Sequence, residues 1–140
     1  MAEKKKKKRK GITTKAKKKE AVARAIVRKG VGTIRINRRE LSTIQPLYVQ
    51  EFLREPIELA GGITGEINID VIVEGGGSMG QAVAARAAIA KGILEYRHDD
   101  KLKKRFLSYD RMLLVDDPRR VEPKKQLGPK ARKKKQKSKR

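Results

Sequence analysis

The sequence predicts a small α/β (α+β) body that carries two extended basic arms, and two observations support this fold class. The first is the distribution of charge: of a formal net charge of +22, residues 1–20 contribute +9 and residues 117–140 contribute +10. Residues 21–116 therefore carry only +3. The second is the pattern of this near-neutral middle, where alternating segments typical of strands are interspersed with segments of helical periodicity. A chain of 140 residues accommodates one such domain with appendages.

The blocks of like charge divide the chain into three parts. Residues 1–19 have almost no apolar side chains and are predicted to be a disordered basic extension until an anion orders them. Residues 20–110 form the predicted globular body. Residues 111–140 are predicted to be an extended basic tail, because turn and breaker residues recur there and stop any regular element.

The body begins with a predicted antiparallel hairpin. Residues 20–29 are partly β-branched, Gly30-Val31-Gly32 supplies a turn, and residues 33–37 alternate between apolar and polar side chains. One face of this hairpin is predicted to be exposed and basic. The side chains expected on that face are Arg24, Arg28 and Arg35.

A helix is predicted after the hairpin. Pro46 suits the first helical position, and Pro56 would stop or kink the helix. Val49, Phe52 and Leu53 share one face at helical spacing. Such an apolar stripe is most often part of a core, so no functional role is assigned to it.

A strand and a second helix follow. Residues 63–74 have a period of two, and their predicted buried face consists of Ile67, Ile69, Val71 and Val73. Ser78 then offers an N-cap for an alanine-rich helix that runs to about Tyr96. The buried stripe predicted for this helix consists of Met79, Val83, Ala90, Ile93 and Leu94, with Arg86 and Lys91 on its rim. Residues 99–107 indicate a short third helix with acids at its start and cations toward its end.

Composition excludes several classes of protein. Cysteine is absent, which rules out disulfides, zinc fingers and thiol chemistry. No stretch approaches the roughly 18 apolar residues of a membrane span, and the N-terminal residues contain no apolar signal core. A cytoplasmic protein is therefore expected.

The acidic residues and the single histidine do not predict an enzyme. His98 precedes Asp99 and Asp100, but neighbours in sequence on a helix point apart, so a solvated or structural histidine is favoured over a general base. Asp116 and Asp117 precede a proline and are more typical of a turn than of a metal pair. We therefore expect no catalytic residues, no metal, no cofactor and no small-molecule substrate.

The stretch VEGGGSMGQAV, residues 73–83, has the G-x-G-x-x-G spacing of a dinucleotide-binding turn. A dinucleotide fold needs an almost continuously apolar strand before this turn, whereas the strand here alternates. A tight turn without a ligand is one remaining interpretation. The other is a turn in which glycines and the free N–H groups of a helix N-terminus bind the phosphates of an RNA strand.

The basic arms indicate a polyanionic partner. Neither arm contains Phe, Tyr or Trp, so both are expected to contact backbone phosphates rather than to stack on bases. A folded RNA, with phosphates converging from several sides, suits this property. A DNA-binding or architectural nucleic-acid-binding protein is the alternative. Attachment to a membrane is not expected, because no amphipathic helix with bulky apolar anchors accompanies either arm.

Three blocks of the sequence, in order, resemble one protein family. KKKEAVARAIVRKGVGTIRIN (17–37) is similar to its opening hairpin, and GGGSMGQAVAARAAIAKGIL (75–94) to its glycine-rich motif and helix. DPRRVEPKKQLGPKARKKKQKSKR (117–140) resembles its C-terminus, including the final Ser-Lys-Arg. The family is that of the universal ninth protein of the small ribosomal subunit, in its archaeal and eukaryotic-like form.

The resemblance implies a mostly antiparallel sheet with helices on one face and a left-handed βαβ crossover. It also implies a structural role in the head of the small ribosomal subunit, bound to the 3′ major domain of the rRNA and to neighbouring ribosomal proteins. The C-terminal tail would extend toward the anticodon stem-loop of peptidyl-site tRNA. The lysine run at residues 4–10 lies outside the family's core pattern.

The residues expected to bind nucleic acid fall into two groups. The rRNA-binding candidates are Lys17, Lys18, Lys19, Arg24, Arg28, Arg35, Gly75, Gly76, Gly77, Ser78, Gln81, Arg119, Arg120, Lys124, Lys125, Lys130 and Arg132. The tRNA-binding candidates at the tip of the tail are Ser138, Lys139 and Arg140.

Overall fold

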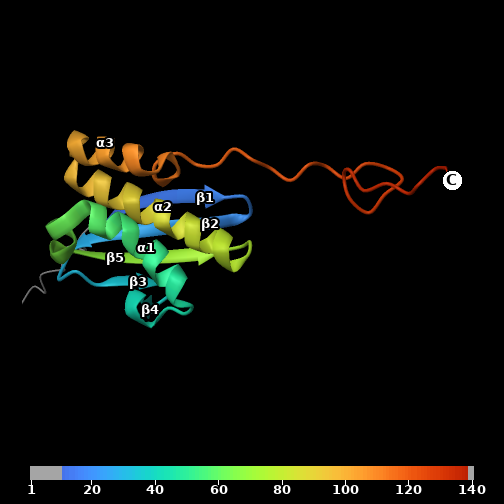
Figure 1. The fold of residues 1–140 in the computed structure, drawn as a ribbon. Coiled ribbons are helices and arrows are strands. Elements are labelled where there is room, and N and C mark those ends of the chain that lie inside the picture. Colours follow the sequence, from blue (N-terminus) through green and yellow to red (C-terminus); the bar gives the residue numbers. More distant parts are fainter. Residues whose placement is uncertain (1–10, 139–140) are drawn as a thin grey trace, which may run out of the picture.

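A computed structural model describes residues 11–138 of the chain (Figure 1). Five strands and three α-helices make up the body, in the order β1 Ile12–Lys18, β2 Ala21–Lys29, β3 Ile34–Ile36, β4 Arg39–Glu40, α1 Leu47–Ala60, β5 Ile67–Glu74, α2 Ser78–Arg97 and α3 Asp100–Tyr109. Short 3₁₀ turns occupy Leu41–Thr43, Gly61–Glu66 and Arg111–Leu113. The α+β fold class is therefore confirmed.

The strands form one sheet in the order β1-β2-β5-β3-β4, in which every neighbouring pair is antiparallel except β3 and β5. The parallel pair is joined by a crossover that contains α1. In Figure 1 both strands run from left to right, β5 lies above β3, and α1 lies in front of the sheet. This crossover is left-handed, as the resemblance implies.

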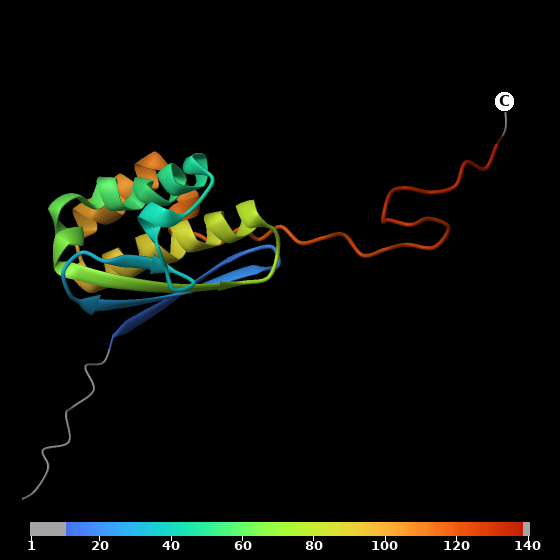
Figure 2. The same ribbon diagram turned by 90° about the horizontal axis from the view of Figure 1, so that it is seen from below.

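All three helices cover the same face of the sheet (Figure 2). The strand residues beneath α2 are small, with Ala16, Ala23 and Ala25 fully buried, and α2 presents alanines to them. Small side chains on both surfaces allow the helix backbone to lie close to the sheet. The predicted buried face of β5, from Ile67 to Val73, is confirmed, because its four apolar side chains are at most 5% exposed.

The prediction of a disordered N-terminal extension is wrong for residues 12–18, which form β1. This segment has a period of two that its lysines obscure: Thr14 and Ala16 are buried, while Thr13 and Lys15 are exposed. Lys15 and Lys17 therefore fall on the face away from the core, and the strand can pair. Residues 1–10, which hold the lysine run, lie outside the described part of the chain.

The predicted hairpin between residues 20–29 and 33–37 is also wrong. β2 forms its hairpin with β1, through a two-residue turn at Lys19 and Glu20, and pairs on its other side with β5. The ladder with β1 has seven residue pairs and the ladder with β5 has eight, whereas β3 is only three residues long. The long ladders satisfy far more backbone groups of β2 than β3 could. The prediction that Arg24, Arg28 and Arg35 share an exposed face is nevertheless confirmed.

Helix α1 begins one residue later than predicted, with Pro46 as its N-cap, and continues past Pro56 to Ala60. Its expected apolar face is confirmed, since Val49 and Leu53 are buried and Phe52 is half-buried. Residues 63–66, predicted as strand, belong to a 3₁₀ turn.

Three predictions for α2 are wrong. Its N-cap is Gly77, and Ser78 is the first helical residue. Arg86 is buried at 6% exposure rather than lying on the rim: it pairs with Glu55 of α1 and with Asp110, and its guanidinium lies 4.3 Å from the centre of the Phe52 ring. The cause is that α2 is buried on two sides, by the sheet and by the other helices. Met79, expected in the core, is 44% exposed.

The predicted third helix is present as α3, but it runs from Asp100 to Tyr109 and has no basic residue in its last turn. The side chain of its N-cap, Asp99, accepts a hydrogen bond from Lys101 N at 2.9 Å. Beyond the turn at Arg111–Leu113, the chain runs along the body and then leaves it as a long tail (Figure 1). The tail is not extended throughout, because Lys135 N donates to Leu127 O at 3.1 Å and closes a loop.

Candidate nucleic-acid interface

The uncovered face of the sheet carries a group of cations, which we call the basic sheet face. It consists of Lys15 of β1, Arg24 and Arg28 of β2, and Arg35 of β3, all exposed. Lys15 and Arg24 are directly opposite each other across the antiparallel pair. Like charges at such positions destabilise a sheet. These four side chains take part in none of the ion pairs among the described residues.

The glycine-rich turn joins β5 to α2 and lies against the β1–β2 hairpin. Gly75 and Gly76 have φ of 76° and 66°, values that favour glycine. A Cβ atom at Gly75 would lie 2.5 Å from the carbonyl oxygen of Glu20, so a larger residue does not fit there. These two glycines have a structural role in packing the turn onto the hairpin.

The start of α2 is open by contrast. A Cβ atom at Gly77 would meet no other part of the described chain within 4 Å, and this glycine is exposed together with Ser78. Hydrogen bonds among the described residues include none from the backbone N–H groups of Ser78, Met79 or Gly80. Gln81 N donates to Gly77 O at 2.9 Å, and Gln81 Nε2 donates to Gly75 O at 3.1 Å, which holds the turn in place. Free N–H groups at a helix N-terminus attract anions.

Segments far apart in the sequence meet at this end of the body. Glu20 of the hairpin turn packs on Gly75, and the neighbouring Lys18 pairs with Asp117 at the base of the tail. In Figure 1 the β1–β2 turn, the start of α2 and the departing tail all lie at the right-hand end of the body. The structure thus brings Lys17–Lys19, the glycine-rich turn and the first residues of the tail together.

Lys18 and Arg119 are placed differently from the other predicted rRNA-binding residues, because both contact the Asp117 carboxylate. The hydrogen bond from Arg119 is the largest of the causes that hold the pKa of Asp117 well below its ordinary value of 3.8, and that from Lys18 is the next. The same contact raises the pKa of Arg119. Lys18 is half-buried, whereas the side chain of Arg119 is still 73% exposed and can contact a further anion.

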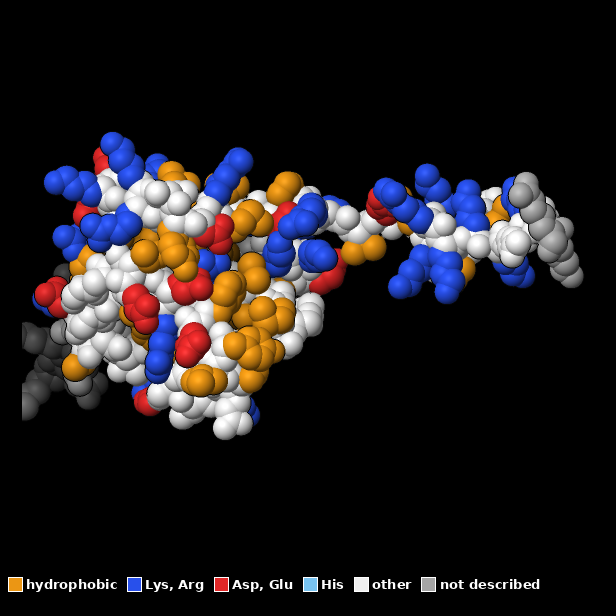
Figure 3. Space-filling model, in the orientation of Figure 1, with side chains coloured by type: hydrophobic (Ala, Val, Ile, Leu, Met, Phe, Trp, Pro, Cys, Tyr) orange, Lys and Arg blue, Asp and Glu red, His pale blue; other side chains and the backbone are white. Residues whose placement is uncertain are grey.

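The remaining candidates of the tail are exposed, and Figure 3 shows Lys and Arg side chains projecting from the tail in several directions. Only Arg132 among them forms an ion pair within the described residues: its Nε donates to Glu122 at 2.9 Å, which lowers the pKa of that glutamate. The exposed candidates are Arg120, Lys124, Lys125, Lys130, Arg132 and Ser138. Lys139 and Arg140 lie outside the described residues.

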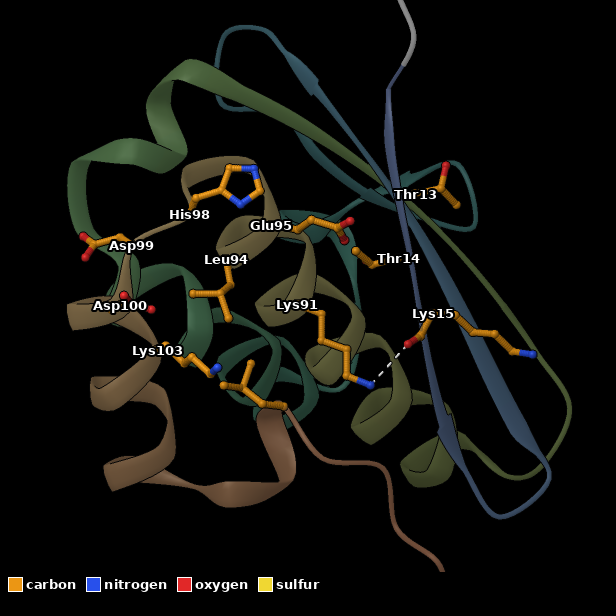
Figure 4. Close-up of a pocket in the computed structure, with 11 residues that line it drawn as sticks. Thr13, Thr14, Lys15, Lys91, Leu94, Glu95, His98, Asp99, Asp100 and Lys103 are labelled. Atoms are coloured by element: carbon orange, nitrogen blue, oxygen red, sulfur yellow. Dashed lines mark hydrogen bonds between the residues drawn. The ribbon is translucent and has the colours of Figure 1, made fainter.

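A surface pocket between β1, α2 and α3 contains the histidine (Figure 4). The imidazole of His98 and the carboxylate of Asp99 point away from each other, so they do not form a catalytic pair. Lys91 Nζ donates to Lys15 O at 3.2 Å, which fastens α2 to the edge of β1. Residues 11–138 contain no group of three or more His, Asp or Glu side chains placed to hold a metal ion. Nor does any helix in that range have the length and apolar character of a membrane span.

Sequence reasoning missed Lys15, which lies beside Arg24 on the basic sheet face. The alternation of residues 12–18 is the signal that identifies it, because Lys15 falls on the same face as Thr13 and Lys17. The lysine-rich surroundings concealed this period in a segment expected to be disordered.

Comparison with known proteins adds an independent finding. Residues 16–140 match the family described as ribosomal protein S9/S16. The small ribosomal subunit protein uS9 of Methanococcus vannielii is 47% identical over 128 residues, which cover 89% of this chain and 96% of that protein. The protein of the same name from Methanococcus maripaludis is 44% identical over 128 residues, with the same coverage. With this match spanning the sheet, the glycine-rich turn and the tail, the chain belongs to the ribosomal protein S9/S16 family.

Proposed function

We propose that this chain is a structural, non-catalytic protein of the small ribosomal subunit, in the cytoplasm, where it binds the 3′ major domain of the rRNA in the head. The observation that carries the proposal is the basic sheet face. Lys15 and Arg24 oppose each other there, and neither forms an ion pair with a carboxylate of residues 11–138, an arrangement that becomes favourable when a phosphate lies between or beside them. Family membership supports rRNA as the source of that phosphate.

The glycine-rich turn and the base of the tail extend this surface. The free N–H groups at the start of α2 provide donors without sequence preference, and Lys17 and Lys19 of the hairpin provide charge beside them. Because the interface consists of cations and backbone donors, it recognises the arrangement of phosphates in a folded RNA rather than a base sequence.

The tail has a second proposed target. Its described residues beyond Arg119 are almost all exposed, so the tail can thread between RNA helices and carry its tip away from the body. We assign the final residues, Ser138 to Arg140, to the anticodon stem-loop of peptidyl-site tRNA, as the family resemblance implies. Neighbouring ribosomal proteins of the head complete the set of partners.

The first experiment compares ligands for the intact chain. Binding to a transcript of the 3′ major domain is measured at moderate salt in competition with duplex DNA of equal length. We expect the RNA to bind more tightly than the DNA. Equal affinity for the two would contradict the proposal and favour the alternative of a general nucleic-acid-binding architectural protein.

The second experiment tests the tip of the tail. Small subunits are assembled with a chain that lacks residues 138–140, and the dissociation rate of peptidyl-site tRNA is measured. Faster dissociation with normal assembly is the expected result. An unchanged dissociation rate would remove the role in tRNA binding and leave the rRNA role intact.

A further inference from the structure

The base of the tail contains a buried carboxylate in a strongly basic segment. The Asp117 side chain is only 2% exposed, although it lies immediately before Pro118, Arg119 and Arg120, which are all exposed. A carboxylate here weakens the attraction of the tail for phosphate. Its burial therefore indicates a different contribution.

Both oxygens of the Asp117 carboxylate are occupied by donors from two parts of the chain. Lys18 Nζ of β1, 99 residues away in sequence, donates to Oδ2. Arg119 donates from its backbone N to Oδ1 at 3.0 Å and from Nε to both oxygens at 3.1 Å. One carboxylate thus joins the body to the tail and also fixes the turn by which the tail begins.

Asp116 makes a second contact between the tail and the body, beside that of Asp117. Its Oδ1 accepts from Lys91 Nζ of α2 at 2.6 Å and lies 3.4 Å from the backbone N of Lys17 in β1. Consecutive carboxylates therefore reach an edge strand and a helix of the body. The third carboxylate of the tail, Glu122, pairs with Arg132 of the tail itself and makes no ion pair with the described part of the body.

We propose that Asp117 is a positioning residue that holds the base of the tail on the β1–β2 hairpin and so sets the direction in which the tail leaves the body. This inference rests on the proposed function of the tail, because direction matters only if the tip has a distant target. A tail fixed at its base samples a narrow cone, which raises the effective concentration of the tip at that target. A tail that pivots freely spreads the same residues over a much larger volume.

The absence of cysteine from the chain makes a distance measurement straightforward. Cysteines are introduced at Ser108 of α3 and at Val121, which is 76% exposed and lies four residues beyond Asp117. Both carry nitroxide labels, and double electron–electron resonance gives the distribution of distances in the free, full-length chain. In the parent chain the Asp117 carboxylate holds the turn as far as Arg119, so only the two residues up to the label are free. Loss of the carboxylate frees the four residues after Asp117 and is expected to widen the distribution by about 3 Å.

Three substitutions are compared in this labelled background. Asp117→Asn keeps the shape of the side chain and removes its charge, and it is expected to widen the distribution. Asp117→Glu keeps the charge and is expected to retain a narrow distribution. Glu122→Gln is the matched control, because it removes a tail carboxylate that forms no ion pair with the described part of the body, and it is expected to leave the distribution unchanged. Circular dichroism confirms that each variant is folded.

Two results would overturn the inference. A distribution as narrow in Asp117→Asn as in the parent chain shows that the carboxylate does not hold the base. Equal widening in Glu122→Gln shows that any loss of negative charge loosens the tail. Because the free chain is used, neither result depends on whether the tail binds tRNA.

The functional consequence is measured in assembled small subunits. Subunits that contain Asp117→Asn are expected to release peptidyl-site tRNA about three to ten times faster. This factor is a small part of the gain in affinity that linking two binding sites provides. Asp117→Glu is expected to restore most of the retention. If the distances widen but tRNA release is unchanged, direction set by Asp117 has no functional effect. If deletion of residues 138–140 is also without effect, the proposed tRNA contact itself is at fault.

Discussion

Removal of charge from the basic sheet face is expected to weaken RNA binding without destabilising the fold. The variant replaces Lys15, Arg24 and Arg28 with alanine. Each is exposed and takes part in no ion pair among the described residues, so no partner is left unsatisfied. Lys15 and Arg24 face each other across the sheet, and their replacement removes a repulsion of about 0.2 to 1 kcal/mol. The free energy of unfolding should therefore stay constant or rise slightly.

The size of the binding defect follows from counterion release. Affinity falls as salt rises, and each lost phosphate contact makes the slope of log affinity against log salt less negative by about 0.7 to 0.9. Three lost contacts therefore reduce the magnitude of the slope by about 2 to 3. When salt rises fourfold, the parent chain should lose about 20 to 40 times more affinity than the variant. Filter binding or fluorescence anisotropy with the 3′ major domain transcript, at several salt concentrations, measures both slopes.

A second triple variant controls for net charge. Lys101, Lys104 and Arg111 are also exposed and unpaired among the described residues, but they belong to α3 and the turn after it, on the helical side of the sheet. Their replacement with alanine removes the same charge and should change the slope by less than the loss of one phosphate contact would, which is about 0.7 to 0.9. Identical slopes for the two triple variants would refute the assignment of RNA to the sheet face, because net charge alone would then explain binding.

Three further predictions concern the turn, the core and the tail. Gly76→Val should lower the free energy of unfolding by about 1 to 3 kcal/mol, because φ at this position is 66°. Gly77→Val should lower it by less than about 1 kcal/mol and should mainly weaken RNA binding. Urea denaturation measures the stability and anisotropy the binding, and equal stability losses in the two variants would favour a turn without a ligand. Arg86→Met should cost about 3 kcal/mol in urea denaturation, since it leaves two partly buried carboxylates without their cation, and a loss below about 1 kcal/mol would contradict a stabilising role for this cluster. The pKa of Asp117 is lowered in the folded chain, so the contribution of this carboxylate to stability is present above the ordinary pKa of 3.8 and is lost as pH falls below it. The difference in unfolding free energy between the parent chain and Asp117→Asn should therefore shrink from pH 7 toward pH 3. A difference that stays constant over this range would count against the ion pair.

Several elements could be predicted because their signals are local. The alternation from Ile67 to Val73 identifies β5, and the alanine-rich segment after the glycines identifies α2. The acid at Asp99 marks the start of α3. In each case the residues that define the element lie within the element itself.

The errors arise where a distant segment decides the outcome. Nothing within residues 20–37 indicates that β5 lies between β2 and β3, because β5 is about thirty residues further along the chain. The sequence predicts Arg86 on the rim because a helix that contains charged residues is expected to bury only one face. In the structure the sheet buries one face of α2, and α1 and α3 bury the opposite face. Glu55 and Asp110 supply the carboxylates that pair with Arg86 there. β1 escapes prediction because its lysines hide a clear period of two.

Composition and charge alone predict the chemistry of this protein's partner. A near-neutral body with two cationic, aromatic-free arms and a glycine-rich turn before a helix is enough to predict a partner rich in phosphate, because charge and composition do not depend on the fold. The positions of the charged side chains on the surface follow from the packing of the chain. Pairing between strands distant in sequence places Lys15 beside Arg24, and the contact of Lys18 with Asp117 joins the tail to the hairpin. Both depend on long-range contacts, which no local pattern specifies.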